Sequence, residues 1–232
     1  MWLRLATAGI DSATLADASE QVAAQRWQLD TLFDPRAVAH DPKGSPDVQG
    51  PDATHGTHVA GIIGAVASAS GDVRGIAPMV SIMPIRAVPD GDERDEEVAR
   101  AIRYAVDNGA QVINMSFGKG YSPGKPAVDS AVRHAASKGV LIVHAAGNDG
   151  ANNDDVPSFP SRRLDGGAEA STWLEIGASS WHVGAGLPAE FSNYGAKSVD
   201  LFAPGVDINS TVPGGRVDEN SGTSMAAPVV SG

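Results

Sequence analysis

Short continuous apolar runs alternate with helically spaced apolar residues through most of the chain. The continuous runs predict buried strands at residues 112–115, 140–143, 173–178 and 199–205. Helical spacing predicts helices over residues 98–106 and 128–135, which Asn108-Gly109 and Gly139 close. Residues 75–88 predict a turn and then a largely buried strand. Strands that alternate with helices favour a mainly parallel sheet covered on both faces, a three-layer α/β/α fold of the α/β class.

The N-terminal part of the chain has a different pattern. Residues 1–34 carry helical patterning, with Leu15, Val22 and Trp27 set among alanines and polar side chains. Four prolines between residues 35 and 51 then predict a loop or an extended approach. No internal repeat, linker or low-complexity segment interrupts the remainder, so the pattern predicts one core domain.

Small residues are frequent in a predicted helix that begins at His55. Glycines occupy positions 56, 61 and 64, and each would cost about 1 kcal/mol relative to alanine in an exposed helix. Their use is the close packing of a buried helix. His55 is then held by a fixed backbone, as a positioned general base requires. The alternative, for a histidine that no other motif accompanies, is a core residue whose ring nitrogens are hydrogen-bonded.

A second polar stretch, residues 144–150, follows the predicted strand at 140–143. Ligand sites in open α/β sheets lie beyond the carboxyl ends of the strands. The side-chain amide of Asn148 is a donor suited to a developing oxyanion. The alternative is an ordinary turn residue.

The last dozen residues place Ser224 just after the turn-forming pair Gly222-Thr223. Small residues then predict the start of a closely packed helix, with Pro228 near its first turn, where a missing N–H costs little. The hydroxyl of Ser224 would lie at a helix N-terminus, where unpaired N–H groups and the helix dipole favour an oxyanion. The alternative is an ordinary Ser/Thr helix cap.

Composition and charge narrow the function classes. The chain of 232 residues is 42% apolar, 19% charged and carries a net charge of −11, which disfavours nucleic acid as a partner. It has no cysteine, which excludes disulfides, a thiol nucleophile and cysteine-based zinc sites. No apolar run approaches the roughly 18 residues of a membrane span, and residues 1–4 do not open a signal peptide. The acidic run at 90–97 predicts a solvated loop entering a helix, with a calcium loop as the alternative.

Four blocks resemble, in the same order, the signature blocks of the subtilisin-like serine peptidases. They are HGTHVAGIIGA at 55–65, VINMSFG at 112–118, HAAGNDG at 144–150 and NSGTSMAAPVVSG at 220–232. GIAP at 75–78, SNYG at 192–195 and FAPG at 202–205 also resemble family segments. The resemblance covers residues 52–232 and implies an incomplete subtilisin-like catalytic domain over that range.

The resemblance implies a serine endopeptidase with Ser224 as nucleophile and His55 as its general base. Asn148 and the Ser224 backbone N–H would form the oxyanion hole. The backbone of Ser116, Phe117 and Gly118 would line the substrate cleft and pair with an extended peptide, and Ala145, Ala146 and Gly147 would form part of the specificity-pocket wall. His58 matches the second, structural histidine of the motif.

The same resemblance implies further properties of the protein. Its partners would be polypeptide substrates, and the protein would be a monomer located outside the cell or in the cell envelope. Structural calcium is expected from the family, although no ligand set is identifiable in the sequence. His40, His134 and His182 have no companion motif and are interpreted as surface or packing residues.

The sequence departs from the family pattern at the aspartate, the third member of the family's Ser-His-Asp catalytic triad. Family members carry an aspartate in an Asp-Ser/Thr-Gly block upstream of the histidine, and this sequence contains no such block. Asp11 is superficially similar, but aligning its neighbours with the family block puts Thr7 in the catalytic place. Residues 28–36 resemble the end of a helical insertion between the aspartate and histidine blocks of some bacterial members. We therefore expect residues 1–51 to be insertion and loop, and the domain to be truncated at both ends.

Two other functions compete with this hypothesis. A peptide-binding pseudoenzyme would keep the cleft without the aspartate, but it would need none of Ser224, His55 and Asn148. A metal-dependent hydrolase would use His55 and His58, but the sequence has no HExxH-type motif. A chelator and a serine-directed phosphonate would distinguish the metal-dependent enzyme from the serine peptidase.

Overall fold

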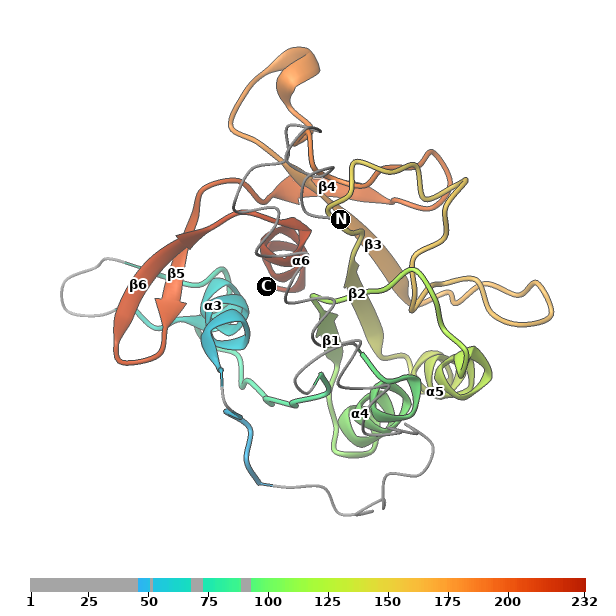
Figure 1. Cartoon of the computed structure of the whole chain (residues 1–232). Helices are drawn as coiled ribbons and strands as arrows, with labels where there is room; N and C mark the ends of the chain where they lie inside the picture. Colours follow the sequence, from blue (N-terminus) through green and yellow to red (C-terminus); the bar gives the residue numbers. More distant parts are fainter. Residues whose placement is uncertain (1–45, 51, 68–72, 89–92) are drawn as a thin grey trace, which may run out of the picture. The chain divides into compact units, whose positions relative to one another are not determined.

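A four-stranded parallel sheet forms the centre of the described part of the chain (Figure 1). The computed structural model describes residues 46–50, 52–67, 73–88 and 93–232. The strands are β1 (Val112–Met115), β2 (Leu141–Ala145), β3 (Trp173–Ser179) and β4 (Leu201–Pro204), in the spatial order β1-β2-β3-β4. All four agree with the predicted strands. The helix predicted within residues 1–34, Asp11 and His40 lie outside the described residues.

Two amphipathic helices cover one face of this sheet. They are α4 (Asp95–Asp107) and α5 (Lys125–Ser137), which pack against each other and bury one core with Ile142 and Trp173. Three acidic residues in the first turn of α4 complement the helix dipole. Past the helix ends, Gly109 and Gly139 adopt φ values of 88° and 70°, which glycine reaches without strain. Both helices are confirmed.

The opposite face of the sheet is covered by α6 (Thr223–Ser231). Ala226 and Ala227 of α6 are fully buried and share a second core with Val143 and Ile176, which project from the other side of β2 and β3. Alternate residues of each strand therefore face different helices, as a strand's period of two requires. The predicted three-layer α/β/α arrangement is confirmed.

The glycine-rich helix α3 (Thr54–Gly64) packs against α6 and against strand β5 of a hairpin. A Cβ atom on Gly61 would lie 2.2 Å from Thr211 Oγ1 and 2.4 Å from Ser210 Oγ. No residue larger than glycine fits there without displacing the hairpin. The predicted close packing is confirmed at Gly61, whereas Gly56 is exposed and a Cβ atom there would meet no other atom within 4 Å.

The hairpin consists of β5 (Ile208–Val212) and β6 (Arg216–Asn220), which pair antiparallel. The sequence pattern did not predict it, although the turn glycines at 214 and 215, both with positive φ, lie between β-branched residues. Buried His58 ties α3 to this hairpin, since its Nε2 atom is 3.1 Å from the carbonyl oxygens of Ile208 and Asp218. These contacts agree with a structural function for His58.

The strand predicted after residue 75 does not form. Residues 81–88 have no regular secondary structure, and Met79, Val80, Ile82 and Met83 are 40% to 94% exposed. An apolar run becomes a buried strand only when a neighbouring strand pairs with it, and no described residue does so here. The prediction of a largely buried strand was therefore wrong for the described part of the chain.

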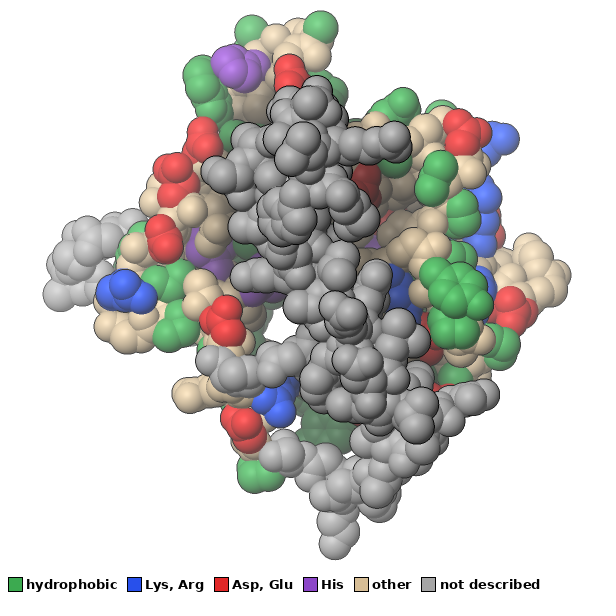
Figure 2. Space-filling view, viewed as in Figure 1, with side chains coloured by type: hydrophobic (Ala, Val, Ile, Leu, Met, Phe, Trp, Pro, Cys, Tyr) green, Lys and Arg blue, Asp and Glu red, His purple; other side chains and the backbone are tan. Residues whose placement is uncertain are grey.

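Acidic side chains lie over several separate parts of the face shown in Figure 2. At the top of that view the loop around the 3₁₀ helix Gly184–Gly186 protrudes from the sheet (Figures 1 and 2). His182 in this loop is exposed and stacks on Trp181, with 4.0 Å between ring centroids. His134 is half-buried and lies 2.7 Å from Asp107 Oδ1. Both agree with the interpretation as surface or packing residues.

Candidate active site

Ser224 is the second residue of α6, directly after a glycine turn. Gly222 has φ 157° and ψ 162°, a backbone region that glycine adopts far more readily than other residues. The turn brings the chain out of β6 and into the helix within two residues. The Ser224 hydroxyl therefore lies in the first turn of a helix. In this turn the N–H groups of Thr223 and Met225 are hydrogen-bonded, whereas the Ser224 N–H has no partner among the described residues.

Pro228 lies inside α6, beyond its first turn, so its predicted place near the first turn was wrong. Without an N–H, Pro228 leaves the Ser224 carbonyl without its usual partner four residues later. The Ser116 hydroxyl donates to that carbonyl at 2.9 Å. In return, the Ser224 hydroxyl donates to the Ser116 carbonyl at 3.2 Å. The proline therefore allows residue 116 to hold the start of the helix at the edge of the sheet.

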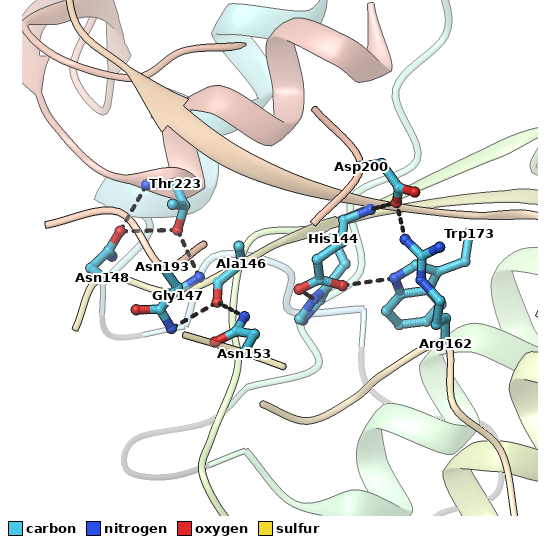
Figure 3. A network of polar contacts seen from close by, with 11 residues as sticks. His144, Ala146, Gly147, Asn148, Asn153, Arg162, Trp173, Asn193, Asp200 and Thr223 are labelled. Atoms are coloured by element: carbon cyan, nitrogen blue, oxygen red, sulfur yellow. Dashed lines mark hydrogen bonds and ion pairs between the residues drawn. The ribbon is translucent and has the colours of Figure 1, made fainter. Parts of the chain in front are cut away.

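Asn148 is clamped to the N-terminus of α6 through its side-chain oxygen. The Thr223 N–H donates to Asn148 Oδ1 at 2.8 Å, and the Thr223 hydroxyl donates to the same oxygen at 2.9 Å (Figure 3). The Thr223 hydroxyl also accepts the Gly147 N–H at 3.1 Å. Because Oδ1 accepts both donors, the amide orientation is fixed, and Nδ2 remains available as a donor.

Two donors face the same space beside Gly222. A Cβ atom on this residue would lie 3.6 Å from Asn148 Nδ2 and 3.7 Å from the Ser224 backbone nitrogen. A side chain there would therefore intrude between them. With glycine at this position the space beside both donors stays open, which agrees with the oxyanion hole that the sequence predicts.

Asn153 and Asn193 hold the loop that carries Asn148. Both donate from Nδ2 to the Ala146 carbonyl, at 2.8 Å and 3.0 Å (Figure 3). Asn193 Oδ1 accepts the N–H groups of Asp149 and Ala151. A Cβ on Gly147 would lie 2.4 Å from Asn193 Nδ2, so the loop approaches Asn193 too closely for a larger residue.

His55 lies in the first turn of α3 and faces a cleft of about 310 Å³ that also contains Ser224 and Asn148. The cleft is lined by Asp52, Thr54, His55, Asn148, Asn220, Ser221, Gly222, Ser224 and Met225. Three residues that the sequence predicts to act together, from three distant parts of the chain, therefore share one cleft. In the described residues no hydrogen bond joins His55 to Ser224, and such bonds often form only when substrate is bound.

The pKa of His55 is lowered from its ordinary value of 6.5. Loss of hydration at the cleft wall is the main cause, and the neighbouring His58 acts in the same direction. The negative charge of Asp52 acts in the opposite direction and raises the His55 pKa. The Oδ1 atom of Asp52 accepts the Thr54 N–H at 2.8 Å. The imidazole of His55 is therefore neutral at pH 7, the form that accepts a proton.

The other predicted substrate-binding residues lie beside the cleft rather than in its lining. Met115 is paired with His144 in the sheet register, so segments 116–118 and 145–147 leave neighbouring strands side by side. Gly118 is exposed, whereas Ala145 and Ala146 are 4% and 0% exposed. Within segment 116–118 only Gly118 is thus exposed, since Ser116 is buried and Phe117 is partly buried, and the two alanines form packed wall rather than surface.

No metal centre is evident in the described ranges, where no three His, Asp or Glu side chains gather around one point. Neither the acidic residues from 93 to 97 nor the His55 and His58 pair forms such a cluster. Asp95 is instead buried and accepts from Ser122 and from the Gly124 N–H. Of the helices described, none is long and apolar enough to cross a membrane.

Comparison with family models and curated proteins gives one consistent match. Residues 29–232 match the model of the Subtilase family. The Thermophilic serine proteinase of Bacillus sp. (strain AK1) is 40% identical over 179 residues, which are 77% of this chain and 41% of the relative. Subtilisin BL of Lederbergia lenta is 38% identical over 180 residues, which are 77% of this chain and 60% of that protein. The Cell wall-associated protease of Bacillus subtilis (strain 168) is 39% identical over 178 residues, 76% of this chain and 18% of the relative.

Solved structures give the same result. A cold adapted subtilisin-like serine proteinase matches with a TM-score of 0.63 and 35% identity, covering 78% of this chain and 60% of that one. The chain thus spans less than two thirds of the length of the curated relatives described above.

Proposed function

The chain belongs to the subtilase family, and from this premise we propose that it carries the catalytic centre of a serine endopeptidase. One observation carries the proposal. Asn148 Nδ2 and the Ser224 N–H border the same space beside Gly222, and His55 lines the same cleft. An oxyanion site next to a hydroxyl and a neutral imidazole is the arrangement that acyl transfer requires.

In the proposed reaction, Ser224 Oγ attacks the carbonyl carbon of a peptide bond while its proton passes to His55. The carbonyl oxygen becomes an oxyanion that accepts from Asn148 and from the Ser224 N–H. His55 then gives the proton to the leaving amine as the C–N bond breaks, which leaves an acyl-enzyme. Water, activated by His55, hydrolyses that ester and restores the Ser224 hydroxyl.

We propose that the carboxylate that orients His55 is not Asp52. The Asp52 side chain is exposed and accepts the Thr54 N–H at the start of α3, so it is committed to that helix end. The orienting aspartate would then come from outside the described residues. In subtilisin, a relative, removal of this aspartate alone lowers kcat by about 3 × 10⁴-fold.

A peptide-binding pseudoenzyme is the second candidate. It is favoured by one observation, that no described carboxylate forms a hydrogen bond with His55. It is disfavoured by the double clamp of Thr223 on Asn148, since a binding module has no use for a donor fixed at an oxyanion position. Polypeptides are the proposed partners in both cases. Location outside the cell or in its envelope is proposed because one relative is named a cell wall-associated protease.

A fluorophosphonate probe tests the proposal. The 232-residue chain and the complete gene product are incubated with the probe, and the modified residue is identified by mass spectrometry. We expect modification at Ser224, faster in whichever form contains the orienting aspartate and unaffected by chelators. Ser231→Ala, a change at the other end of the same helix, is the matched control and should label normally. If a folded complete gene product never labels, peptide binding becomes the better interpretation.

The lowered pKa of His55 gives a pH prediction for the 232-residue chain. The base must be neutral to accept the Ser224 proton, so activity is lost as the pH falls through the His55 pKa. Half-maximal kcat/KM is therefore expected below pH 6.5. Asp52→Asn should move this midpoint to still lower pH, because the opposing negative charge is removed while the side-chain oxygen can still accept the Thr54 N–H.

Asp47→Asn is the control for this experiment, since Asp47 also accepts backbone N–H groups but does not line the cleft. The pH midpoint of this variant should equal that of the unmodified chain. A midpoint above pH 6.5 that Asp52→Asn leaves unchanged would contradict the assignment of His55 as the base.

A further inference from the structure

One polar side chain interrupts the apolar sequence of β1. Asn114 is the single polar residue within Val112–Met115, and it is half-buried. Its neighbour in the sheet register, Val143, belongs to the apolar core that β2 and β3 share with α6. A polar group on such a face costs free energy unless it is hydrogen-bonded, so the bonds of Asn114 indicate its purpose.

Asn114 is connected to both ends of α6. The hydroxyl of Ser231, the last residue of the helix, donates to Asn114 Oδ1 at 2.9 Å. Asn114 Nδ2 donates to Ser116 Oγ at 2.9 Å, and the Ser116 hydroxyl donates to the Ser224 carbonyl at 2.9 Å. Residues 114 and 116 are two positions apart, so their side chains lie on the same face of the sheet. One asparagine therefore links the two ends of the helix that carries the proposed nucleophile.

The number of available protons fixes the direction of these bonds. The Ser116 hydroxyl has one proton, and its oxygen can accept another hydrogen bond. When Asn114 donates to that oxygen, the proton is free for the Ser224 carbonyl, which Pro228 deprives of its usual helical donor. With the amide reversed, Asn114 Oδ1 would take the Ser116 proton, and this carbonyl would lose it. The orientation with Nδ2 toward Ser116 thus satisfies more polar groups.

We propose that Asn114 is a positioning residue for the nucleophile, because it directs the Ser116 hydroxyl to the Ser224 carbonyl. This inference rests on the proposed function, in which Ser224 attacks the substrate. The carbonyl belongs to the residue whose hydroxyl and N–H act in the reaction, so a donor fixed on the carbonyl helps to hold both. Asn114 is not part of the cleft lining, and it acts through Ser116 rather than on the substrate.

The expected effect of this positioning falls on kcat rather than on KM. A peptide would pair with the backbone of segment 116–118, and that backbone keeps its donors and acceptors when the Ser116 hydroxyl turns away. Attack depends instead on the place of Ser224 Oγ relative to the carbonyl carbon of the substrate. A small displacement of one reacting atom lowers the rate strongly.

Asn114→Asp tests the proposal in the complete gene product. The aspartate side chain has nearly the same shape, but its carboxylate only accepts hydrogen bonds. The neighbouring hydroxyls of Ser116 and Ser231 can both donate to it, so the added charge is hydrogen-bonded. The Ser116 proton then no longer reaches the Ser224 carbonyl. We expect kcat on a peptide substrate to fall about tenfold, while KM changes by less than about twofold.

Asn114→Ala distinguishes this direction of the hydroxyl from simple packing. Alanine cannot take the Ser116 proton, so the bond to the Ser224 carbonyl can persist, and kcat should fall by only about two- to threefold. A residue that merely fills space would give the opposite order, because alanine leaves a cavity and aspartate does not. Asn114→Ala also adds no charge, so it gives a second result if the aspartate variant does not fold.

A double-variant cycle tests whether Asn114 acts through Ser116. Ser116→Ala removes the hydroxyl between the asparagine and the Ser224 carbonyl, and it should lower kcat by about the same factor as Asn114→Asp. Combining the two substitutions should cost little more than either one, because both remove the same bond. Independent effects on kcat would overturn the inference.

Asn108→Asp is the matched control for the added charge. Asn108 also donates from Nδ2, to the Tyr104 carbonyl at 2.8 Å, but it caps the end of α4 rather than α6. The variant should keep the kcat and KM of the unmodified protein. An equal loss of kcat in this control would show that negative charge, not the lost donor, causes the effect.

Hydrogen exchange provides a measurement that does not depend on activity. The Met225 N–H donates to the Gly222 carbonyl at 3.0 Å and reports on the first turn of α6. Asn114→Asp should increase its exchange rate several-fold, and Asn108→Asp should not. If no form cleaves a peptide, the proposed function fails, whereas faster exchange would still support the positioning of the helix start. Unchanged kcat or unchanged exchange in a folded Asn114→Asp protein would overturn the inference.

Discussion

Ser224→Ala is expected to remove nearly all peptide hydrolysis. The size of the loss depends on whether the aspartate that orients His55 is present. In subtilisin, removal of the serine alone lowers kcat by roughly 2 × 10⁶-fold, about as much as removal of the whole triad. A complete gene product with its orienting aspartate should show a loss of that order. A form without the aspartate already operates about 3 × 10⁴-fold lower, so the same substitution should cost it only about 70-fold.

Steady-state kinetics on one peptide substrate measure these losses, and the fold of each variant is checked by its thermal transition. Ser224→Ala removes the donor to the Ser116 carbonyl but leaves the Ser116 hydroxyl bonded to the residue 224 carbonyl. The helix start should therefore stay in place, and KM should change little. A loss much smaller than 70-fold in a folded chain would mean that another nucleophile performs the reaction.

The sheet and the helices that flank it follow from local patterns in the sequence. β1 and β2 are continuous apolar runs, and α4 and α5 have apolar faces that end at Gly109 and Gly139. Such signals are carried within a dozen residues. The strand predicted after residue 75 depends instead on a partner from elsewhere in the chain. Its exposed apolar residues show that composition alone cannot specify pairing.

The candidate site, like the fold, has one part that local motifs predict and another part that they do not. The proposed catalytic groups, which are the His55 imidazole, the Ser224 hydroxyl and the Asn148 amide, could be identified as candidates from short motifs. Their support could not, because it is assembled from residues far apart in sequence. Thr223 orients Asn148 across 75 positions, and Asn193 holds the loop from 47 positions away. Even Pro228 was misjudged, because its effect on the Ser224 carbonyl depends on a hydroxyl at residue 116.

Asn148→Asp is expected to lower kcat by at least about 10²- to 10³-fold, the usual cost of removing one oxyanion donor. The substitution is almost isosteric and keeps an oxygen that the Thr223 N–H and hydroxyl can reach, so the clamp on the loop is preserved. What changes is the atom beside Gly222, where a donor becomes a negatively charged acceptor. Repulsion then acts mainly on the transition state, in which negative charge has developed, so KM should change far less than kcat.

Thr223→Val tests how much the positioning of Asn148 Nδ2 contributes while that donor itself is still present. It removes the hydroxyl that bonds Asn148 Oδ1 and accepts the Gly147 N–H, but it leaves the Thr223 backbone donor in place. With one of two clamping bonds gone, Asn148 Nδ2 remains but is less firmly held, so kcat should fall by about tenfold, well short of the loss in Asn148→Asp. In the double variant, Thr223→Val should add little, because the donor that it positions is already absent. Losses that simply multiply would show that Thr223 does not act through Asn148. A fall confined to KM would show that Asn148 binds the substrate rather than the oxyanion.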